Sequence, residues 1–231
     1  MKRDAANSNP GCRLAALDEL CQWLSHFRLT HPMRVAIDGR TAAGKTSLAD
    51  ELQYALSRSG KSVTRTSIDG FHQSRAIRHA RGRLSATGYY KDARNLSSVR
   101  DCLLKPLGPG GNRFYRTQTF DLDSDLEIQQ EPMLADSEMI LLVDGSFLLR
   151  PELNPYCDAR IFVEVSKETS KERGIARDMD RLGGYAQASK LYDERYLPAF
   201  DLYQSECDAL AAANVVFNNN VFAHPRVNWN K

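Results

Sequence analysis

The sequence predicts an α/β fold with a mostly parallel central sheet and helices on both faces. Short runs of apolar and β-branched residues recur along the chain, and segments with helical periodicity lie between them. Residues 139–143 are apolar throughout, which is typical of a strand buried on both faces of a parallel sheet. Residues 159–165 repeat this pattern. We expect the 231 residues to form a single domain.

The remaining elements are expected in chain order. Residues 12–27, within an N-terminal segment 1–30, place leucines at helical spacing and predict an amphipathic helix. Further strands are expected at 35–37, 62–68 and 215–217. Further helices are expected at 47–56, 95–104, 168–181 and 187–210, the last with a break at Pro198.

Residues 74–130 predict an insertion over one face of the sheet. The first part, 74–94, is rich in basic residues and has little apolar periodicity, which is typical of a long loop that carries at most a short helix. Residues 114–120 and 126–130 have the character of short strands, and we expect them to form one projecting hairpin.

The sequence GRTAAGKT, at 39–46, fits the phosphate-binding pattern G-x-x-x-x-G-K-[ST]. It lies between an expected strand and an expected helix, which is the context that this motif requires. Backbone N–H groups of such a loop and the N-terminus of the helix bind phosphate oxygens, the lysine reaches the outer phosphates and the hydroxyl ligates Mg²⁺. The residues expected to bind the nucleotide are Gly39, Arg40, Thr41, Ala42, Ala43, Gly44, Lys45, Thr46 and Ser47.

The composition excludes several other classes of protein. A formal net charge of +2 gives no basic surface of the kind that nucleic-acid binding requires. The five cysteines are scattered, without a C-x-x-C pair, which argues against both a disulfide framework and a zinc site. No apolar run approaches the length of a membrane span and no leader is evident, so a cytoplasmic protein without a membrane partner is expected.

Two carboxylates follow expected strands, where open α/β sheets place their ligands. Asp69 is positioned to activate a hydroxyl or to help hold Mg²⁺, although a helix cap is the ordinary alternative for such a residue. Asp144 is suited to Mg²⁺, either directly or through water, and its alternative is a turn residue before glycine.

Residues 168–184 predict a helical lid. Arg173, Arg177 and Arg181 recur every four residues on one helical face, where they repel one another unless an anion lies opposite. Nucleotide phosphates meet that requirement, and we expect Arg173 and Arg177 to take part in catalysis. A solvated face with nearby acidic partners is the alternative.

The acceptor side of the site is less defined. Tyr89, Tyr90 and Tyr115 offer aromatic faces, and Asp92 offers a carboxylate for sugar hydroxyls. His72 draws attention because it lies three residues from Asp69. We expect these five residues, with Asp69, to bind the acceptor; surface or packing positions are the alternative.

In their order along the chain, GRTAAGKTS, SIDGFH, LLVDGSFLL, KERGIARD and RYLPAFDLY resemble the uridine kinase and phosphoribulokinase group of P-loop kinases. The resemblance implies a three-layer P-loop kinase fold with a helical lid, ATP and Mg²⁺ as cofactors, and a role for Asp69 as base or Mg²⁺ partner. His72 stands where uridine kinases commonly have tyrosine, and Asp144 where they commonly have glutamate.

We therefore expect transfer of the γ-phosphate of ATP to a hydroxyl of a nucleoside, such as uridine or cytidine, or a related riboside. A kinase of another small alcohol, such as pantothenate or nicotinamide riboside, is the first alternative, and a nucleotide-dependent regulatory protein is the second. The absence of an N-K-x-D guanine-reading motif argues against a GTPase. Homo-oligomerisation and the choice between ATP and GTP are left open.

Overall fold

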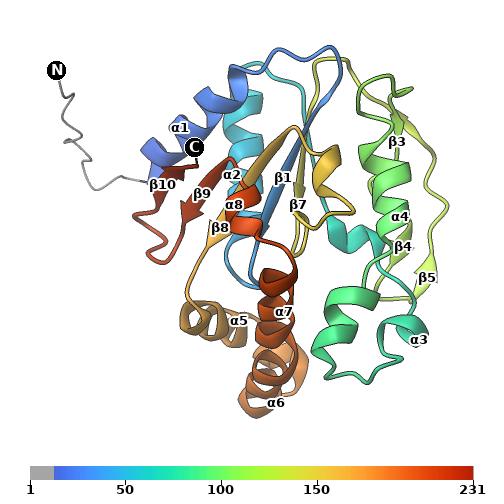
Figure 1. Ribbon diagram of the computed structural model, residues 1–231, viewed down its shortest axis with the longest axis vertical. Helices are drawn as coiled ribbons and strands as arrows, with labels where there is room; N and C mark the ends of the chain where they lie inside the picture. The colour runs from blue at the N-terminus through green and yellow to red at the C-terminus, as the bar shows by residue number, and fades with distance from the viewer. Residues whose placement is uncertain (1–12, 231) are drawn as a thin grey trace.

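The computed structural model describes residues 13–230, and its centre is a six-stranded sheet of order β10-β9-β8-β1-β7-β2 (Figure 1). The strands β1 (Met33–Gly39), β2 (Val63–Ser67), β7 (Ile140–Asp144), β8 (Ala159–Glu164) and β9 (Val215–Asn218) run parallel. The predicted α/β fold with a mostly parallel sheet is thus confirmed. β10 (Arg226–Trp229), which the sequence analysis missed, pairs antiparallel with β9 at one edge.

Successive residues of the central strands face opposite sides of the sheet, and helices cover both sides. Val35 and Ile37 of β1 pack in one cluster with α1 (Arg13–Ser25) and α2 (Lys45–Arg58). Ala36 packs in the other cluster with residues of η3 (Val99–Leu104), α7 (Leu197–Glu206) and α8 (Ala209–Ala212). All seven residues of β1 are buried, as the apolar sequence of a central parallel strand requires.

The register of the sheet brings three strand ends together. In β7, Asp144 is paired with Ile37 of β1 on one side and with Ser67 of β2 on the other. The phosphate-binding loop follows β1, and Asp69 follows β2 by two residues. The loop and both predicted carboxylates therefore share the carboxyl edge of the sheet.

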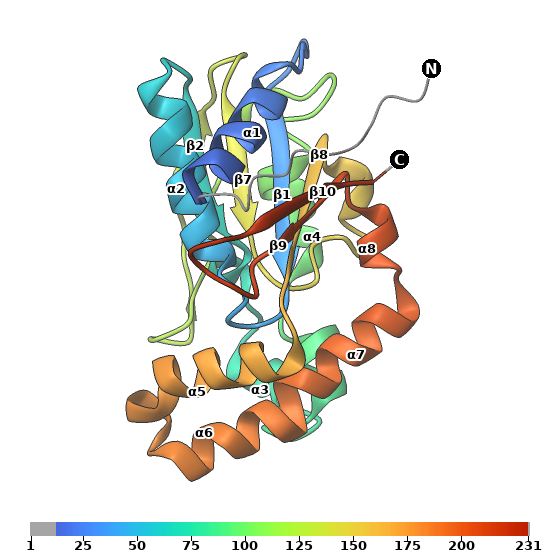
Figure 2. The ribbon, with the colours of Figure 1, turned by 90° about the vertical axis from the view of Figure 1, so that its left-hand side faces the viewer.

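The C-terminal helices form a layer beyond this edge. α5 (Lys167–Leu182) contains most of the residues that were predicted to form a lid, 168–184. α6 (Tyr185–Leu191) continues through η5 (Tyr192–Tyr196) into α7. Figures 1 and 2 place α5, α6 and the short α3 (Arg75–Arg78) beyond the same end of the sheet. The helical geometry changes next to Pro198, because the π-helical turn η5 ends at Tyr196 and α7 begins at Leu197 with Pro198 in its first turn, although the backbone stays helical through this junction.

The insertion contains more structure than its sequence indicates. Besides α3 it forms the π-helical turn η2 (Gly88–Asp92) and the continuous helical path of α4 (Leu96–Ser98) and η3. The predicted hairpin is present in shortened form at residues 120–127, and a second ladder that was not predicted accompanies it. β3 (Phe114–Tyr115) pairs with β6 (Met133–Leu134), and β4 (Phe120–Asp121) pairs with β5 (Leu126–Glu127), so two short ladders share this segment.

The predicted N-terminal helix is confirmed over the described residues, whereas Cys12 and the rest of residues 1–12 lie outside them. Within residues 13–230, no helix combines the length and the apolar character needed to cross a lipid bilayer.

Candidate active site

The phosphate-binding loop has the backbone that its glycines permit. Gly39 has φ +148°, and a Cβ there would lie 2.3 Å from the carbonyl oxygen of Val163 in β8. Gly44 has φ +94° and caps the N-terminus of α2, so that the loop turns directly into the helix. The expected arrangement of strand, loop and helix is therefore present, with the free N–H groups of α2 at the carboxyl edge of the sheet.

Lys45 and Thr46 are the first residues of α2, and both line a cleft at the carboxyl edge of the sheet. The ammonium group of Lys45 donates to the carbonyl oxygen of Arg40 at 2.6 Å. Burial lowers the pKa of Lys45 to about 8, although the carboxylates of Asp38 and Asp144 oppose this shift. Lys45 is thus a mostly buried ammonium group with little contact to water.

Asp144 is buried at the end of β7 and contacts two side chains. Its Oδ2 accepts a hydrogen bond from the Thr46 hydroxyl at 2.7 Å, and its Oδ1 lies 2.8 Å from Nη2 of Arg65. Burial raises the pKa of Asp144, while Thr46 and Arg65 act in the opposite direction. A hydroxyl and a carboxylate oxygen therefore lie together beside the phosphate-binding loop.

Asp69 belongs to η1 (Ile68–Phe71), and 62% of its side chain is exposed to the cleft. Its Oδ1 lies 2.6 Å from Nη2 of Arg94, which is itself buried. Desolvation alone would raise the pKa of Asp69, but Arg94, His72 and Lys45 outweigh it and hold the pKa below its usual value. Asp69 is therefore an ionised carboxylate with one oxygen already bound.

His72 completes this network. Its Nδ1 lies 2.7 Å from the carbonyl oxygen of Asp69, so Nδ1 carries the proton, and its Nε2 accepts from Nη1 of Arg94 at 2.6 Å. Burial and the Arg94 charge lower the pKa of His72 to about 4. The histidine is therefore neutral at pH 7 and fixes Arg94 against Asp69.

The three arginines of α5 have different surroundings. Arg177 lines the cleft and binds Asp178 through two hydrogen bonds of 2.8 and 2.9 Å. Arg181 lines the cleft as well. Arg173 instead donates to the backbone carbonyls of Asn219 and Asn220, both at 2.9 Å, so the predicted row of three arginines does not face one ligand.

The predicted acceptor residues also separate. Tyr89 and His72 line the cleft, but the phenol of Tyr90 is buried against Cys207, and that of Tyr115 contacts Thr64 and Met139 in the core. Asp92 forms an ion pair with Arg81 instead of facing the cleft. Tyr90, Tyr115 and Asp92 are therefore packing or surface residues in this structure, contrary to expectation.

All these elements enclose a cleft of about 600 Å³. Its lining is predominantly basic on the side of the insertion and of α5 to η5. The cationic side chains are Lys45, Arg75, Arg78, Arg83, Arg94, Arg177, Arg181 and Arg195, and the carboxylates are Asp69, Asp123, Asp144 and Asp178.

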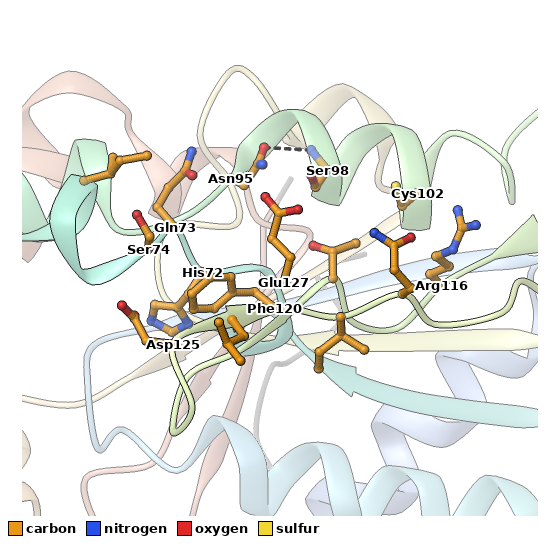
Figure 3. Close-up of a pocket in the computed structure, with 15 residues that line it drawn as sticks. His72, Gln73, Ser74, Asn95, Ser98, Cys102, Arg116, Phe120, Asp125 and Glu127 are labelled. Atoms are coloured by element: carbon orange, nitrogen blue, oxygen red, sulfur yellow. Dashed lines mark hydrogen bonds between the residues drawn. The ribbon is translucent and has the colours of Figure 1, made fainter.

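A second cavity of about 490 Å³ adjoins the cleft at His72. Figure 3 shows it between the helix that carries Asn95 and Ser98 and the ladder residues Phe120 and Glu127. It opens beside the cleft, so His72 separates two hollows that the insertion builds.

Sequence reasoning missed three residues that shape the site. Asp38, fully buried in β1, accepts hydrogen bonds from the backbone N–H groups of Phe147 and Leu149 and from the Tyr203 hydroxyl. Arg65 and Arg94 contact the two carboxylates. An acid before the phosphate-binding loop was visible in the sequence, whereas nothing there distinguishes Arg65 or Arg94 from other basic residues.

A parallel sheet with a phosphate-binding loop after β1 and carboxylates after β2 and at the end of β7 is typical of the P-loop class of nucleotide-binding proteins. Residues 35–219 match the Phosphoribulokinase / Uridine kinase family, and the chain belongs to this family. It is accordingly an enzyme that transfers a phosphoryl group to a hydroxyl, and the predicted family resemblance is confirmed.

Individual relatives agree with this assignment. The chain is 27% identical to uridine-cytidine kinase B of Dictyostelium discoideum over 174 residues, which are 75% of this chain and 70% of the relative. A possible uridine kinase from Bacillus stearothermophilus superimposes with a TM-score of 0.70 at 22% identity, covering 88% of this chain and 98% of the other. A putative fructose transport system kinase from Silicibacter gives 0.69 at 22% identity, covering 82% and 94%. The two solved structures share the fold.

Proposed function

We propose that the protein transfers the γ-phosphate of ATP to a hydroxyl of a nucleoside or a related riboside. The observation that carries this proposal is the convergence of Lys45, Thr46, Asp69 and Asp144 on one cleft at the carboxyl edge of the sheet. The similarity to uridine-cytidine kinase B favours a riboside as the acceptor. A cytoplasmic location, as the dispersed cysteines indicate, is part of the same proposal.

The phosphate-binding loop holds the triphosphate in this proposal. Backbone N–H groups from Gly39 to Ser47 bind its oxygens, and Lys45 leaves the Arg40 carbonyl to reach the outer phosphates. Arg177 and Arg181 approach the same phosphates from α5 and neutralise charge that spreads over the transferred group.

Thr46 and Asp144 fit a magnesium ion because they supply the oxygen ligands that it prefers. Within residues 13–230 there is no cluster of three or more His, Cys, Asp or Glu side chains suited to a metal ion. One or two protein ligands accord with Mg²⁺ that is held mainly by nucleotide phosphates and water. When bound, the ion would neutralise phosphate charge, and Asp69, which lines the same cleft, is a further candidate partner in this proposal.

Asp69 orients the acceptor hydroxyl. Its lowered pKa makes it a weak base, which suits a loose transition state in which the hydroxyl loses its proton late. Arg94 binds Oδ1 and leaves Oδ2 to accept the hydroxyl proton. Positioning is therefore the main contribution of this carboxylate.

A second candidate is a kinase of another small alcohol. It is favoured by the burial of Tyr90 and Tyr115, because neither ring is available to stack on a nucleobase. Both proposals use the same residues to bind ATP. They differ only in the acceptor that binds next to the insertion.

Turnover of wild type and two variants tests the proposal. We expect MgATP and an acceptor panel of nucleosides, ribosides and small alcohols to give ADP and a phosphorylated product, detected by mass. Lys45→Ala and Asp69→Asn should each lower kcat/KM by at least 100-fold, since each removes a charge that acts in the transition state.

Asp92→Asn is the matched control, because it removes a carboxylate of the insertion that faces Arg81 and not the cleft. Its activity should remain within about twofold of wild type, consistent with an exposed ion pair. Full activity in Asp69→Asn would remove that residue from the mechanism. ATP binding without acceptor-dependent turnover would favour a regulatory protein.

A further inference from the structure

Arg195 is a buried cation without an anionic partner. It lies in η5, is 8% exposed and lines the cleft. Among residues 13–230, no carboxylate lies within ion-pair distance of its guanidinium group, and its Nε has no hydrogen-bond partner. Burial of an unpaired charge is costly, so this arrangement requires an explanation.

The other buried arginines in the described part of the chain are all paired. Arg34 binds Asp158 at 2.8 Å, Arg78 binds Asp125 at 3.1 Å, Arg94 binds Asp69 at 2.6 Å, and Arg150 binds Glu152 at 2.9 Å. The fold therefore supplies a carboxylate wherever it buries a guanidinium, with Arg195 as the exception within this range.

Aromatic contacts hold Arg195 in place without satisfying its donors. The guanidinium carbon lies 4.9 Å from the ring centroid of Tyr89 and 5.7 Å from that of Tyr196. Such contacts stabilise the charge through the ring faces, but the N–H groups at the edge of the guanidinium plane still require acceptors. The guanidinium group therefore contacts two aromatic rings while the residue lines the cleft.

The surroundings of Arg195 belong to the insertion and are basic. Its pKa is lowered mainly by burial and further by the charges of Arg94 and Arg83. Burial and the charge of Arg195 also lower the pKa of His79. The phosphate-binding loop contributes none of these groups, so this positive charge belongs to the part of the cleft wall that the insertion and η5 form.

We propose that Arg195 binds an anionic group, a carboxylate or a phosphate, on the acceptor itself. This inference rests on the proposed kinase activity and narrows its acceptor to a small hydroxyl compound that carries its own negative charge. A riboside with such a group satisfies both proposals. The ionised Asp69 in the same cleft repels that anion, so the anion occupies the Arg195 side while the hydroxyl approaches Asp69.

Binding to the protein saturated with Mg²⁺ and a non-hydrolysable ATP analogue tests this inference, because the phosphate loop is then filled. The probes are matched pairs of neutral and anionic compounds: ribose and ribose 5-phosphate, panthenol and pantothenate, glycerol and D-glycerate. Calorimetry should show at least tenfold tighter binding for the anionic member of one or more pairs. Equal affinities within every pair would overturn the inference.

Arg195→Gln should lower the affinity for that anionic compound at least tenfold. The affinity for the ATP analogue should stay within twofold of the wild-type value. Arg195→Lys should recover part of the loss because it restores the charge without the planar donors. Arg58→Gln is the matched control, since it removes one positive charge from the end of α2, outside the cleft. A variant that loses the ATP analogue instead of the anion would assign Arg195 to the nucleotide and overturn the inference.

Turnover separates the two proposals. If an anionic compound binds through Arg195 but no ADP is formed, the kinase proposal fails while the anion site stands. If neutral ribosides are phosphorylated at least as efficiently as their anionic counterparts, the kinase proposal stands and the anion site fails.

Discussion

At the scale of single residues, the site depends on a histidine that must stay neutral. Protonation of His72 would place a second N–H against the Arg94 guanidinium, which already donates to Nε2. The folded protein therefore resists a proton that the unfolded chain accepts readily. The same contact keeps Arg94 available to Asp69.

The free energy of unfolding should consequently depend on pH through His72. Its pKa is about 4 in the folded protein against 6.5 when unperturbed, so this contribution is complete above pH 6.5 and is lost as the pH falls to 4. The loss is on the order of 3 kcal/mol. Urea unfolding should show a shallower pH dependence in His72→Gln, which retains one donor and one acceptor. An unchanged slope between pH 4 and 6.5 would contradict the neutral histidine.

Lys45 should take up a proton when the nucleotide binds. Phosphate oxygens favour the charged amine and raise its pKa from about 8. At pH 8 the uptake should approach about half a proton per ATP. Calorimetry in two buffers of different ionisation enthalpy measures this quantity, and Lys45→Met should lack the uptake. Equal uptake in the variant would place the titrating group elsewhere.

At the scale of elements, Gly174 allows α5 to pack closely against η5. A Cβ at this position would lie 1.9 Å from both Cζ and Oη of Tyr192 in η5. The Tyr192 hydroxyl donates to Asp178 at 3.1 Å, and Asp178 in turn binds Arg177. Close packing of α5 on η5 thus orients an arginine of the cleft.

Gly174→Ala should therefore destabilise the protein by about 1 to 3 kcal/mol through overpacking. The sign is informative because the same exchange in an unconstrained helix is stabilising by about 1 kcal/mol. Combination with Tyr192→Ala should cost less than the sum of the two single variants in urea unfolding. Strict additivity would show that the two residues do not compete for space.

Two π-helical turns, η2 and η5, were not predicted from the sequence. Apolar periodicity located the helices of the C-terminal layer, but η5 adds a wider turn before Pro198 and η2 does so at Tyr90. Such a turn changes which residues face inward, so that Tyr90 enters the core and Arg195 is buried. Regular helical spacing carries no sign of either change.

At the scale of the whole molecule, Asp38 joins three parts of the fold. It lies in β1 and accepts from Phe147 and Leu149 after β7 at 2.9 and 3.0 Å, and from Tyr203 in α7. Burial raises its pKa, while these donors act in the opposite direction. The central strand, the segment after β7 and the C-terminal layer are thereby connected at one carboxylate.

Asp38→Ala should lower the free energy of unfolding on the order of 4 kcal/mol, because it leaves several buried donors without an acceptor. Tyr203→Phe is the matched control, and its cost should be about 1 to 2 kcal/mol because only one hydrogen bond is lost. Chemical denaturation monitored by circular dichroism measures both. If Asp38→Ala lowered the free energy of unfolding less than Tyr203→Phe does, Asp38 would not connect the three parts of the fold as described.

More of the residues predicted for the donor side of the site line the cleft than of those predicted for the acceptor side. Gly39 to Thr46, Asp69 and Asp144 were identified because a phosphate-binding loop and strand ends fix their positions locally along the chain. The insertion has no comparable signal, since its two short ladders are set by contacts distant in sequence. Arg195 lies within YDERY, which resembles an ordinary solvated helix face.

This division has a consequence for how new specificities can arise. The residues proposed to bind the triphosphate include the loop that follows β1, whereas Arg195 and several others proposed to meet the acceptor lie in η5 and in the insertion. Substitutions in the insertion can therefore alter the preferred acceptor while the central strands and the phosphate-binding loop keep their packing. A library confined to residues 74–130 and 195 is accordingly the economical starting point for directed evolution of this enzyme.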